Sequence, residues 1–357
     1  MRKILLVAIV FAVTSVALAA ENITYPNVTP GFEVAFPRDE GSHPEFRIEW
    51  WYVTGWLIGA DKRERGFQIT FFRARPDNVA SDNPSPFSPR HILFAHVALS
   101  DVSEGKLLHA QRSARAGLGL AEAKTGATNV WIGDWLLRQD GNQYRAKILA
   151  PQFAFDFQFQ ARSAPILNGA RGYSQKSPNP LAASYYYSIA QLQLTGKLIQ
   201  HGKTQSVTGT AWLDHEWSSE YMDPRAAGWD WAGINFDDGA ALMAFRMREH
   251  SGKTLWAGGT YRDKNGAIKI LRPEEISFTP LKQWRSPRTH ASYPVSCRVR
   301  AGDREIILQP LLDDQELDSG ATTRAVYWEG AVRALIDGKI IGRGYLELTG
   351  YASPLAF

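Results

Sequence analysis

The sequence predicts an all-β protein made of two antiparallel β-barrel domains in tandem. Apolar and polar residues alternate along short runs, turn-forming residues separate these runs, and a weak pattern from the first half recurs in the second. Alternation with a period of two is typical of half-buried antiparallel strands. No stretch carries a helical stripe longer than about three turns at the helical period of about 3.6 residues.

The individual elements follow from this alternation and from the turn residues between the runs. Four glycine-containing tetrads are predicted as hairpin turns because Gly and Asn tolerate positive φ. These turns are D-G-N-Q (140–143), F-D-D-G (236–239), D-K-N-G (263–266) and I-D-G-K (336–339). The clearest predicted strands are Phe67 to Arg75, Phe153 to Ala161, Gln191 to Leu198 and Tyr345 to Tyr351.

The internal repeat predicts the division into domains. The run E-W-W-Y-V-T-G-W-L (Glu49 to Leu57) is followed by a strand ending in F-F-R, and W-D-W-A-G-I-N-F (Trp229 to Phe236) is followed by A-F-R. The closing segments of the two halves also correspond. We therefore expect an N-terminal domain over residues 21–222 and a C-terminal domain over residues 223–357. Closure into barrels would leave no unpaired edge strands.

The first residues have the pattern of an export signal. Two cations precede an apolar run, and small residues follow as far as Ala20. This predicts a cleaved secretory signal peptide over residues 1–20, since Thr14 and Ser15 interrupt the run before it reaches the about 20 residues of a membrane anchor. The chain has one cysteine, Cys297, and an exported chain without an intramolecular disulfide suits the bacterial periplasm.

The charge balance excludes one class of partner. The chain holds 40 Lys and Arg against 36 Asp and Glu, a formal charge of +4, and removal of Arg2 and Lys3 with the signal peptide leaves the mature chain nearly neutral. No run of basic residues interleaves with aromatic residues. We therefore expect no nucleic-acid partner, and a mature chain that is soluble and does not span a membrane.

Two irregular segments interrupt the alternation. Residues 163–184 contain three prolines and two glycines, and residues 77–90 form a similar insertion between two predicted strands. Long loops in compact domains are often functional. Residues 163–184 are predicted to be either a linker or a lid over a barrel mouth, and residues 77–90 a second lid.

The run A-W-L-D-H-E-W-S-S (Ala211 to Ser219) carries the strongest chemical signal. In a strand, His215 shares a face with Trp217, while Asp214 and Glu216 share the opposite face. One face thus combines an imidazole with an indole, which suits an apolar pocket with one proton donor or acceptor. The other face carries two carboxylates that could pair with an arginine, Arg225 or Arg246, or hold a turn.

Other chemistries fit this run less well. Consecutive strand residues cannot converge on one ion, and no zinc motif supplies further ligands, so we expect no metal site. A G-x-S-x-G motif is absent, so a serine nucleophile at Ser218 or Ser219 would rest on adjacency alone.

Further aromatic strands extend the candidate site. E-W-W-Y-V-T-G-W and W-D-W-A-G place indoles beside acids, and H-V-A-L-S-D-V adds a histidine. Core packing alone would also explain these residues, because paired tryptophans in strands usually build a core. The candidate pocket residues are Glu49, Trp51, His96, Trp229, Asp230 and Trp231.

At these residues the sequence resembles the AttH/carotenoid 1,2-hydratase family of lipocalin-like proteins. The matching elements run in order through most of the chain: E-W-W-Y-V-T-G-W, F-A-H-V-A-L-S-D, A-W-L-D-H-E-W-S-S, G-W-D-W and G-Y-L-E-L-T-G-Y. The resemblance implies two lipocalin-like β-barrel domains packed together, with an apolar ligand site near their junction.

The resemblance also implies a reaction. Characterised family enzymes add water to an isoprenoid double bond without a cofactor, and His215 and Trp217 match a histidine and tryptophan implicated there. The hydratases carry a Tyr and an Asp on the following strand, whereas residues 240–248 here contain neither. The acid would then be Asp214, Glu216, Asp230 or Glu49. The candidate catalytic residues are His215, Trp217, Asp214 and Glu216.

Two other classes of function stay open at this point. Some relatives resemble accessory proteins of ABC-type lipid or lipoprotein export systems, which implies a periplasmic carrier for an isoprenoid or acyl chain, possible in an aromatic-lined barrel. Alternatively, both barrels could be filled by their own side chains, which would make the protein a scaffold. The distinguishing feature is a carboxyl group that shares a cavity with His215.

Overall fold

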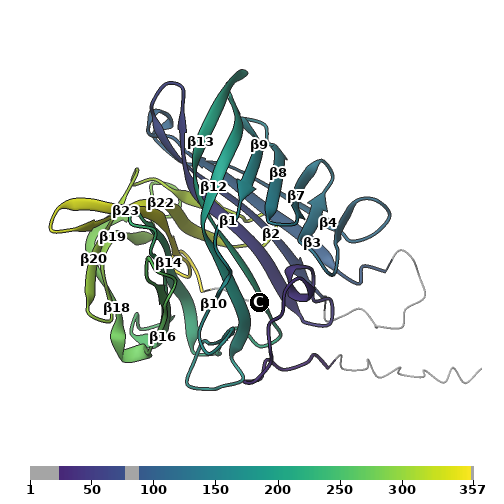
Figure 1. Cartoon of the computed structure of the whole chain (residues 1–357), viewed down its shortest axis with the longest axis vertical. Coiled ribbons are helices and arrows are strands. Elements are labelled where there is room, and N and C mark those ends of the chain that lie inside the picture. The colour runs from purple at the N-terminus through teal and green to yellow at the C-terminus, as the bar shows by residue number, and fades with distance from the viewer. Residues whose placement is uncertain (1–23, 77–87, 355–357) are drawn as a thin grey trace, which may run out of the picture.

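The computed structural model describes residues 24–76 and 88–354 and is almost entirely β-structure. Its described strands form a 13-stranded and a 10-stranded antiparallel sheet, which confirms the predicted fold class (Figure 1). Three single-turn 3₁₀-helices are the helical elements of the described ranges: η1 (Arg38–Glu40), η2 (Val102–Glu104) and η3 (Pro273–Glu275). The predicted signal peptide and most of the predicted second lid lie outside the described residues.

The first sheet contains strands β1 to β13, and its order is β4-β3-β2-β1-β13-β12-β9-β8-β7-β6-β5, with β10 and β11 paired to β12. The strands are β1 (Ile48–Gly59), β2 (Glu64–Ala74), β3 (Ile92–Ser100), β4 (Leu108–Arg115), β5 (Ala121–Ala123), β6 (Asn129–Ile132), β7 (Trp135–Asp140), β8 (Gln143–Leu149), β9 (Phe153–Gln160), β10 (Ile166–Leu167), β11 (Tyr173–Gln175), β12 (Ala183–Gln200) and β13 (Lys203–Ser218).

The second sheet contains strands β14 to β23, and its order is β17-β16-β15-β14-β23-β22-β20-β19-β18, with β21 paired to β22. The strands are β14 (Ala226–Phe236), β15 (Ala241–Glu249), β16 (Thr254–Arg262), β17 (Ile268–Leu271), β18 (Ile276–Arg285), β19 (Ser292–Ala301), β20 (Arg304–Pro310), β21 (Glu316–Asp318), β22 (Val326–Ile336) and β23 (Lys339–Leu348).

The two sheets repeat one topology, as the sequence repeat predicts. In each, the first strand lies between the second strand and the last: β1 between β2 and β13, β14 between β15 and β23. The four predicted hairpin turns are confirmed, and Asp337 and Gly338 between β22 and β23 both have positive φ. The predicted domain boundary at residues 222 and 223 lies in the connection between β13 and β14.

Each sheet curls around its own apolar core, and a third core lies between the sheets. The strand alternation divides β1 and β13 between two of these cores. Trp51 and Trp217 belong to the first core, whereas Tyr52 and Trp212 belong to the third. The two faces of these strands therefore look into different compartments, and this division positions the site.

Polar contacts tie the sheets together. The Trp56 indole donates to the Gly344 carbonyl over 2.9 Å, and Glu64 of β2 pairs with Arg333 and Arg343 of the second sheet. The segment 163–184 is not a linker between the sheets, because it folds back on β12 as β10 and β11.

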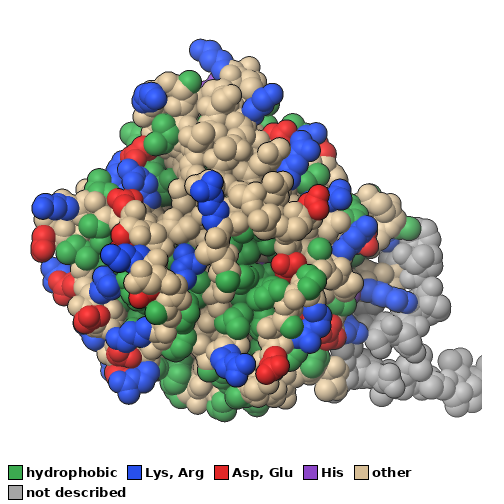
Figure 2. Space-filling view, in the orientation of Figure 1, with side chains coloured by type: hydrophobic (Ala, Val, Ile, Leu, Met, Phe, Trp, Pro, Cys, Tyr) green, Lys and Arg blue, Asp and Glu red, His purple; other side chains and the backbone are tan. Residues whose placement is uncertain are grey.

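The surface carries interspersed charges. In Figure 2, basic and acidic side chains alternate over the visible face, and hydrophobic side chains gather in its lower central part. Within the described ranges, the protein has no helix with the length and apolar character that crossing a bilayer requires.

Candidate active site

The D-H-E-W block lies at the end of β13, and its side chains point in two directions as strand alternation predicts. His215 and Trp217 point into the first core, where His215 faces Glu49. Asp214 and Glu216 point toward the second sheet, where Asp214 contacts Tyr186 and Trp212. The block therefore contributes to two separate sites.

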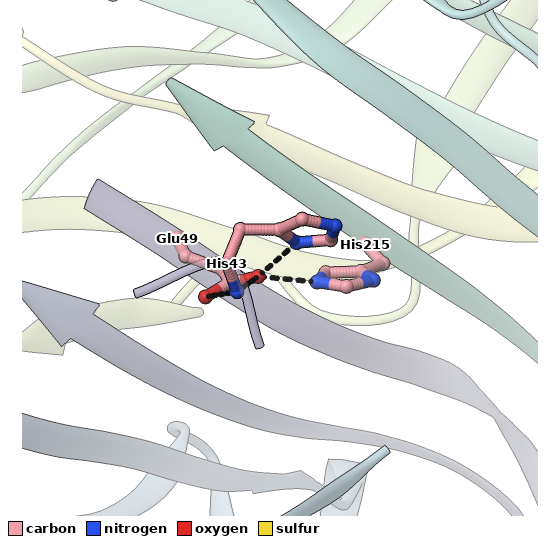
Figure 3. Close-up of side chains that lie close together, drawn as sticks. All are labelled: His43, Glu49 and His215. Carbon is pink, nitrogen blue, oxygen red and sulfur yellow. Dashed lines mark hydrogen bonds and ion pairs between the residues drawn. The ribbon is translucent and has the colours of Figure 1, made fainter. Parts of the chain in front are cut away.

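The first site is a buried hydrogen-bonded cluster of His43, Glu49 and His215 (Figure 3). His43 Nδ1 lies 2.8 Å and His215 Nε2 lies 2.9 Å from the same oxygen, Glu49 Oε1. The Arg73 guanidinium donates to Glu49 Oε2 over 2.8 Å. Although burial opposes ionisation, Arg73 and the two histidines hold the pKa of Glu49 well below its usual range.

Tryptophan rings cover this cluster. The Trp217 ring stacks on His43 with centroids 3.8 Å apart, and the Trp51 ring stacks on His215 at 4.8 Å. Burial lowers the pKa of His215. For His43, hydrogen bonds to Asp39 and Glu49 outweigh the effect of burial and raise the pKa to about 9. The cluster is thus a chain of satisfied donors and acceptors.

The same three residues have the spacing of metal ligands. Their donor atoms lie within 4.8 Å of one another. However, the Arg73 guanidinium is bound to the carboxylate, and a metal cation there would be repelled by that charge. The donor set therefore fits a hydrogen-bonded ion cluster better than a metal centre.

The second site is a pocket between the two sheets, here called the junction pocket. It encloses about 280 Å³ and opens near the start of β1 and the end of β2, where Arg47 and Arg75 line it. Its walls are mainly aromatic: Trp50, Tyr52, Phe72, Phe94, Tyr186, Tyr221, Trp229, Trp231 and Tyr327. Such a concave aromatic surface is typical of a site for an apolar small molecule.

Five acidic residues line the junction pocket. Apart from Glu49, whose carboxylate is bound within the histidine cluster, they are called the pocket carboxyls: Asp214, Glu216, Glu329 and Glu347. Glu329 of β22 and Glu347 of β23 stand directly opposite each other in the strand register. Burial and the charge of Glu347 raise the pKa of Glu329 well above its usual range. Burial raises the pKa of Glu347 to about 7. This pair therefore holds at least one proton at neutral pH.

The pair also has unused hydrogen-bonding capacity. Among the described residues, Glu329 Oε1 and the Tyr52 hydroxyl meet no partner at good hydrogen-bond geometry, although the Tyr52 and Tyr327 hydroxyls lie close enough to the Glu329 carboxyl to oppose the rise of its pKa. Glu347 Oε2 accepts a bond from the Trp229 indole over 3.1 Å. Because buried polar groups are normally paired, unpaired ones beside a cavity are candidates for contact with a ligand or water.

The other two pocket carboxyls have defined partners. Asp214 accepts bonds from Ser188, Trp212 and Tyr186, and burial nevertheless raises its pKa to about 7. Glu216 accepts a bond from Ser184 and lies 2.8 Å from the ammonium of Lys176. The suggested partners for these acids were wrong, because Arg225 pairs with Asp223 and Arg246 pairs with Asp230.

The structure places five of the predicted site residues at the junction pocket and five away from it. The residues on its wall are Glu49, Asp214, Glu216, Trp229 and Trp231, although the Glu49 carboxylate is bound within the histidine cluster. His215, Trp217 and Trp51 face the first core instead. A catalytic part for His215 and Trp217 stays a prediction, and they have no direct contact with this pocket.

His96 and Asp230, both expected in the pocket, have structural partners outside it. His96 bonds to the Tyr327 hydroxyl over 2.9 Å and to Thr322, so it joins the sheets behind the pocket wall. Asp230 lies on the opposite side of β14 from its neighbouring tryptophans, where Arg246 and Arg248 neutralise it. Strand alternation explains this separation.

Sequence reasoning missed Glu329, Glu347 and Lys176. The signal for the two glutamates is an acid within an apolar strand, in Y-W-E-G-A-V and Y-L-E-L. Buried acids in such strands are rare unless they are paired. No local sequence pattern predicts that Lys176 is buried.

Comparisons with known proteins agree with the observed fold and identify a family. A family model described as AttH-like matches residues 27–351. A crystal structure of a Nitrosomonas europaea protein designated AttH has 49% identity and a TM-score of 0.86, and the match covers 91% of this chain and 99% of that one. No curated protein sequence matches this chain.

Two more distant structures share the fold alone. Kievitone hydratase from Nectria haematococca has 14% identity and a TM-score of 0.68, with 94% of this chain and 98% of that one covered. CghA has 13% identity and a TM-score of 0.51, with 92% of this chain and 95% of that one covered.

Proposed function

This chain belongs to the AttH-like family, and from that premise we propose that its junction pocket binds an apolar unsaturated ligand and adds water to a carbon–carbon double bond. The ligand class is an isoprenoid or acyl chain, because the walls are aromatic and the polar groups are few and grouped. The predicted signal peptide supports a periplasmic location for this reaction.

The observation that carries the proposal is the pairing of Glu329 with Glu347 in an aromatic pocket. Two carboxyls that face each other without a counter-cation cannot both ionise easily, so the pair keeps a proton available at neutral pH. Protonation of an alkene requires such an acid beside the double bond. Kievitone hydratase shares this fold, but the proposal rests on the carboxyls of this chain.

The pocket walls supply the second requirement of the reaction. Protonation of the double bond leaves a carbocation, which the faces of Trp50, Trp229 and Trp231 stabilise through their π-electrons. Water then adds to the cation and releases a proton. His215 has no direct contact with the ligand in this scheme and stabilises the wall through Glu49 and the start of β1.

The experiment that tests this function uses the mature protein with a mixture of isoprenoid alkenes and unsaturated fatty acids. We expect one class to gain the mass of one water in the wild type and in the exposed control Glu122→Gln. Glu329→Gln is expected to reduce that gain by about 100-fold or more, the usual contribution of general acid catalysis. Unchanged turnover in Glu329→Gln would refute the role of the carboxyl pair.

A second candidate is a non-catalytic periplasmic carrier of an isoprenoid or acyl lipid, working with an ABC-type permease complex. The aromatic lining of the pocket favours this function as much as catalysis. Native mass spectrometry of protein purified from its own periplasm separates the two. A co-purifying lipid that stays chemically unchanged on incubation would support the carrier and count against the hydratase.

A further inference from the structure

Lys176 is a buried lysine beside the junction pocket. It follows β11, and its ammonium lies 2.8 Å from Glu216 Oε1 and donates to the Ser174 hydroxyl over 2.9 Å. Aromatic rings surround it, and the Phe245 centroid is 4.4 Å and the Tyr186 centroid 5.0 Å from Nζ. Lysine is almost never fully buried unless it is paired, so this geometry indicates an ion pair with Glu216, although burial lowers the pKa of Lys176.

The ion pair with Lys176 distinguishes Glu216 from the other pocket carboxyls. Within the described ranges, Asp214 is bound by two hydroxyls and an indole, and Glu347 by an indole, none of which carries a charge. Lys176 thus gives an ionic partner to Glu216. An adjacent ammonium favours the charged form of a carboxylate, whereas burial without such a partner favours the protonated form.

Two of the arginines that line the pocket, Arg73 and Arg75, have partners other than Glu216. Arg73 is bound to Glu49, and the Arg75 guanidinium lies 5.5 Å from the centroid of the Tyr25 ring. Glu216 itself lies on the pocket wall, opposite Trp50 in the register of β1 and β13. Its partner Lys176 lies behind the wall, so the negative end of the ion pair faces the ligand.

We propose that the Lys176–Glu216 ion pair gives the junction pocket a carboxylate that stabilises cationic groups on an apolar chain and accepts the proton released by water. This inference deepens the proposed hydration and rests on it. The ligand class it adds is an alkyl chain with a positive centre, whether a carbocation or an amine.

The proton balance of the reaction follows from this division of roles. The Glu329–Glu347 pair gives one proton to the alkene carbon, and the π-electrons form the new C–H bond. A water oxygen then forms the C–O bond, and its proton passes to Glu216. Transfer of that proton back to the Glu329–Glu347 pair restores the site, so the net reaction is alkene plus water to alcohol.

The test compares two probes with the same chain length below their micellar concentrations. N,N-Dimethyldodecylammonium is cationic at neutral pH and mimics the carbocation, whereas 1-dodecanol is neutral. Binding is followed by quenching of tryptophan fluorescence, to which Trp50 and Trp229 on the wall contribute. We expect the wild type to bind the ammonium about tenfold more tightly, the size of one partly screened charge contact.

The decisive variant is the double substitution Lys176→Met/Glu216→Gln, which removes both charges and leaves no buried ion unpaired. We expect it to bind both probes equally, with dodecanol affinity unchanged, while the exposed control Lys197→Met keeps the tenfold preference. Glu216→Gln alone should disfavour the ammonium. A wild type without preference, or a double variant that retains it, overturns the inference and leaves the pocket standing. Failure of both probes to bind the wild type overturns the pocket as well.

Discussion

Glu329 and Glu347 face each other across the antiparallel strands β22 and β23, in the wall that closes the pocket between the two sheets. Like charges opposite each other in a sheet are destabilising, and the strands gain stability only while the pair keeps a proton. The arrangement that suits the pocket for acid chemistry therefore has a cost in stability that depends on pH.

The first prediction concerns that cost. The pKa of Glu347 is raised to about 7 in the folded protein, so its contribution is fully present below about pH 4.5 and is lost as the pH rises through 7. In Glu347→Gln, the free energy of unfolding should fall less as the pH rises. Its slope against pH should differ from that of the wild type by about 1.4 kcal/mol per pH unit. Urea denaturation across this range measures it, and Glu122→Gln serves as the control. Parallel pH profiles for Glu347→Gln and the wild type would contradict the prediction.

The histidine cluster predicts a second pH effect at higher pH. The pKa of His43 is raised to about 9, so the stability from its protonated form is complete below about pH 6.5 and is lost as the pH rises through 9. Between these two pH values, the free energy of unfolding of the wild type should fall by about 3 kcal/mol more than that of His43→Gln. Denaturation at about pH 6 and pH 10 tests this, and equal losses would show that His43 is not charged in the fold.

A third prediction separates the two sites on β13. His215→Ala leaves the buried Glu49 without one of its donors, and the free energy of unfolding should fall by about 3 kcal/mol or more. Because His215 does not line the junction pocket, the folded fraction should bind dodecanol as the wild type does. If His215→Ala abolishes binding but leaves stability intact, the junction pocket is not the ligand site.

Two buried tyrosines give a matched test of the hydrogen bonds at the pocket. The Tyr186 hydroxyl donates to Asp214 and accepts from Trp231, whereas the Tyr52 hydroxyl lies near the Glu329 carboxyl but meets no partner at good hydrogen-bond geometry among the described residues. Tyr186→Phe should lower the free energy of unfolding by about 1 to 3 kcal/mol, and Tyr52→Phe should leave it nearly unchanged. Chemical denaturation of both variants measures the difference. Equal losses would mean that Tyr52 is bonded in the fold.

Strand alternation in the sequence determined how the D-H-E-W block divides. A strand turns successive side chains to opposite faces, so Asp214 and Glu216 had to oppose His215 and Trp217, as the structure confirms. The same rule separated Asp230 from Trp229 and Trp231. The hairpin turns were equally local, since a two-residue turn such as Asp337–Gly338 depends on the φ angles of its own residues.

The tertiary structure alone decided which face became which site. Alternation does not say which side of a strand looks into a barrel and which side looks toward the neighbouring sheet. Docking of the second sheet on β1 and β13 brought Glu329 and Glu347 beside Asp214, more than a hundred residues away in the chain. The way in which the segment after β10 folds against β12 brings Lys176 into contact with Glu216. Such contacts depend on the packing of whole sheets, and no local pattern of residues encodes them.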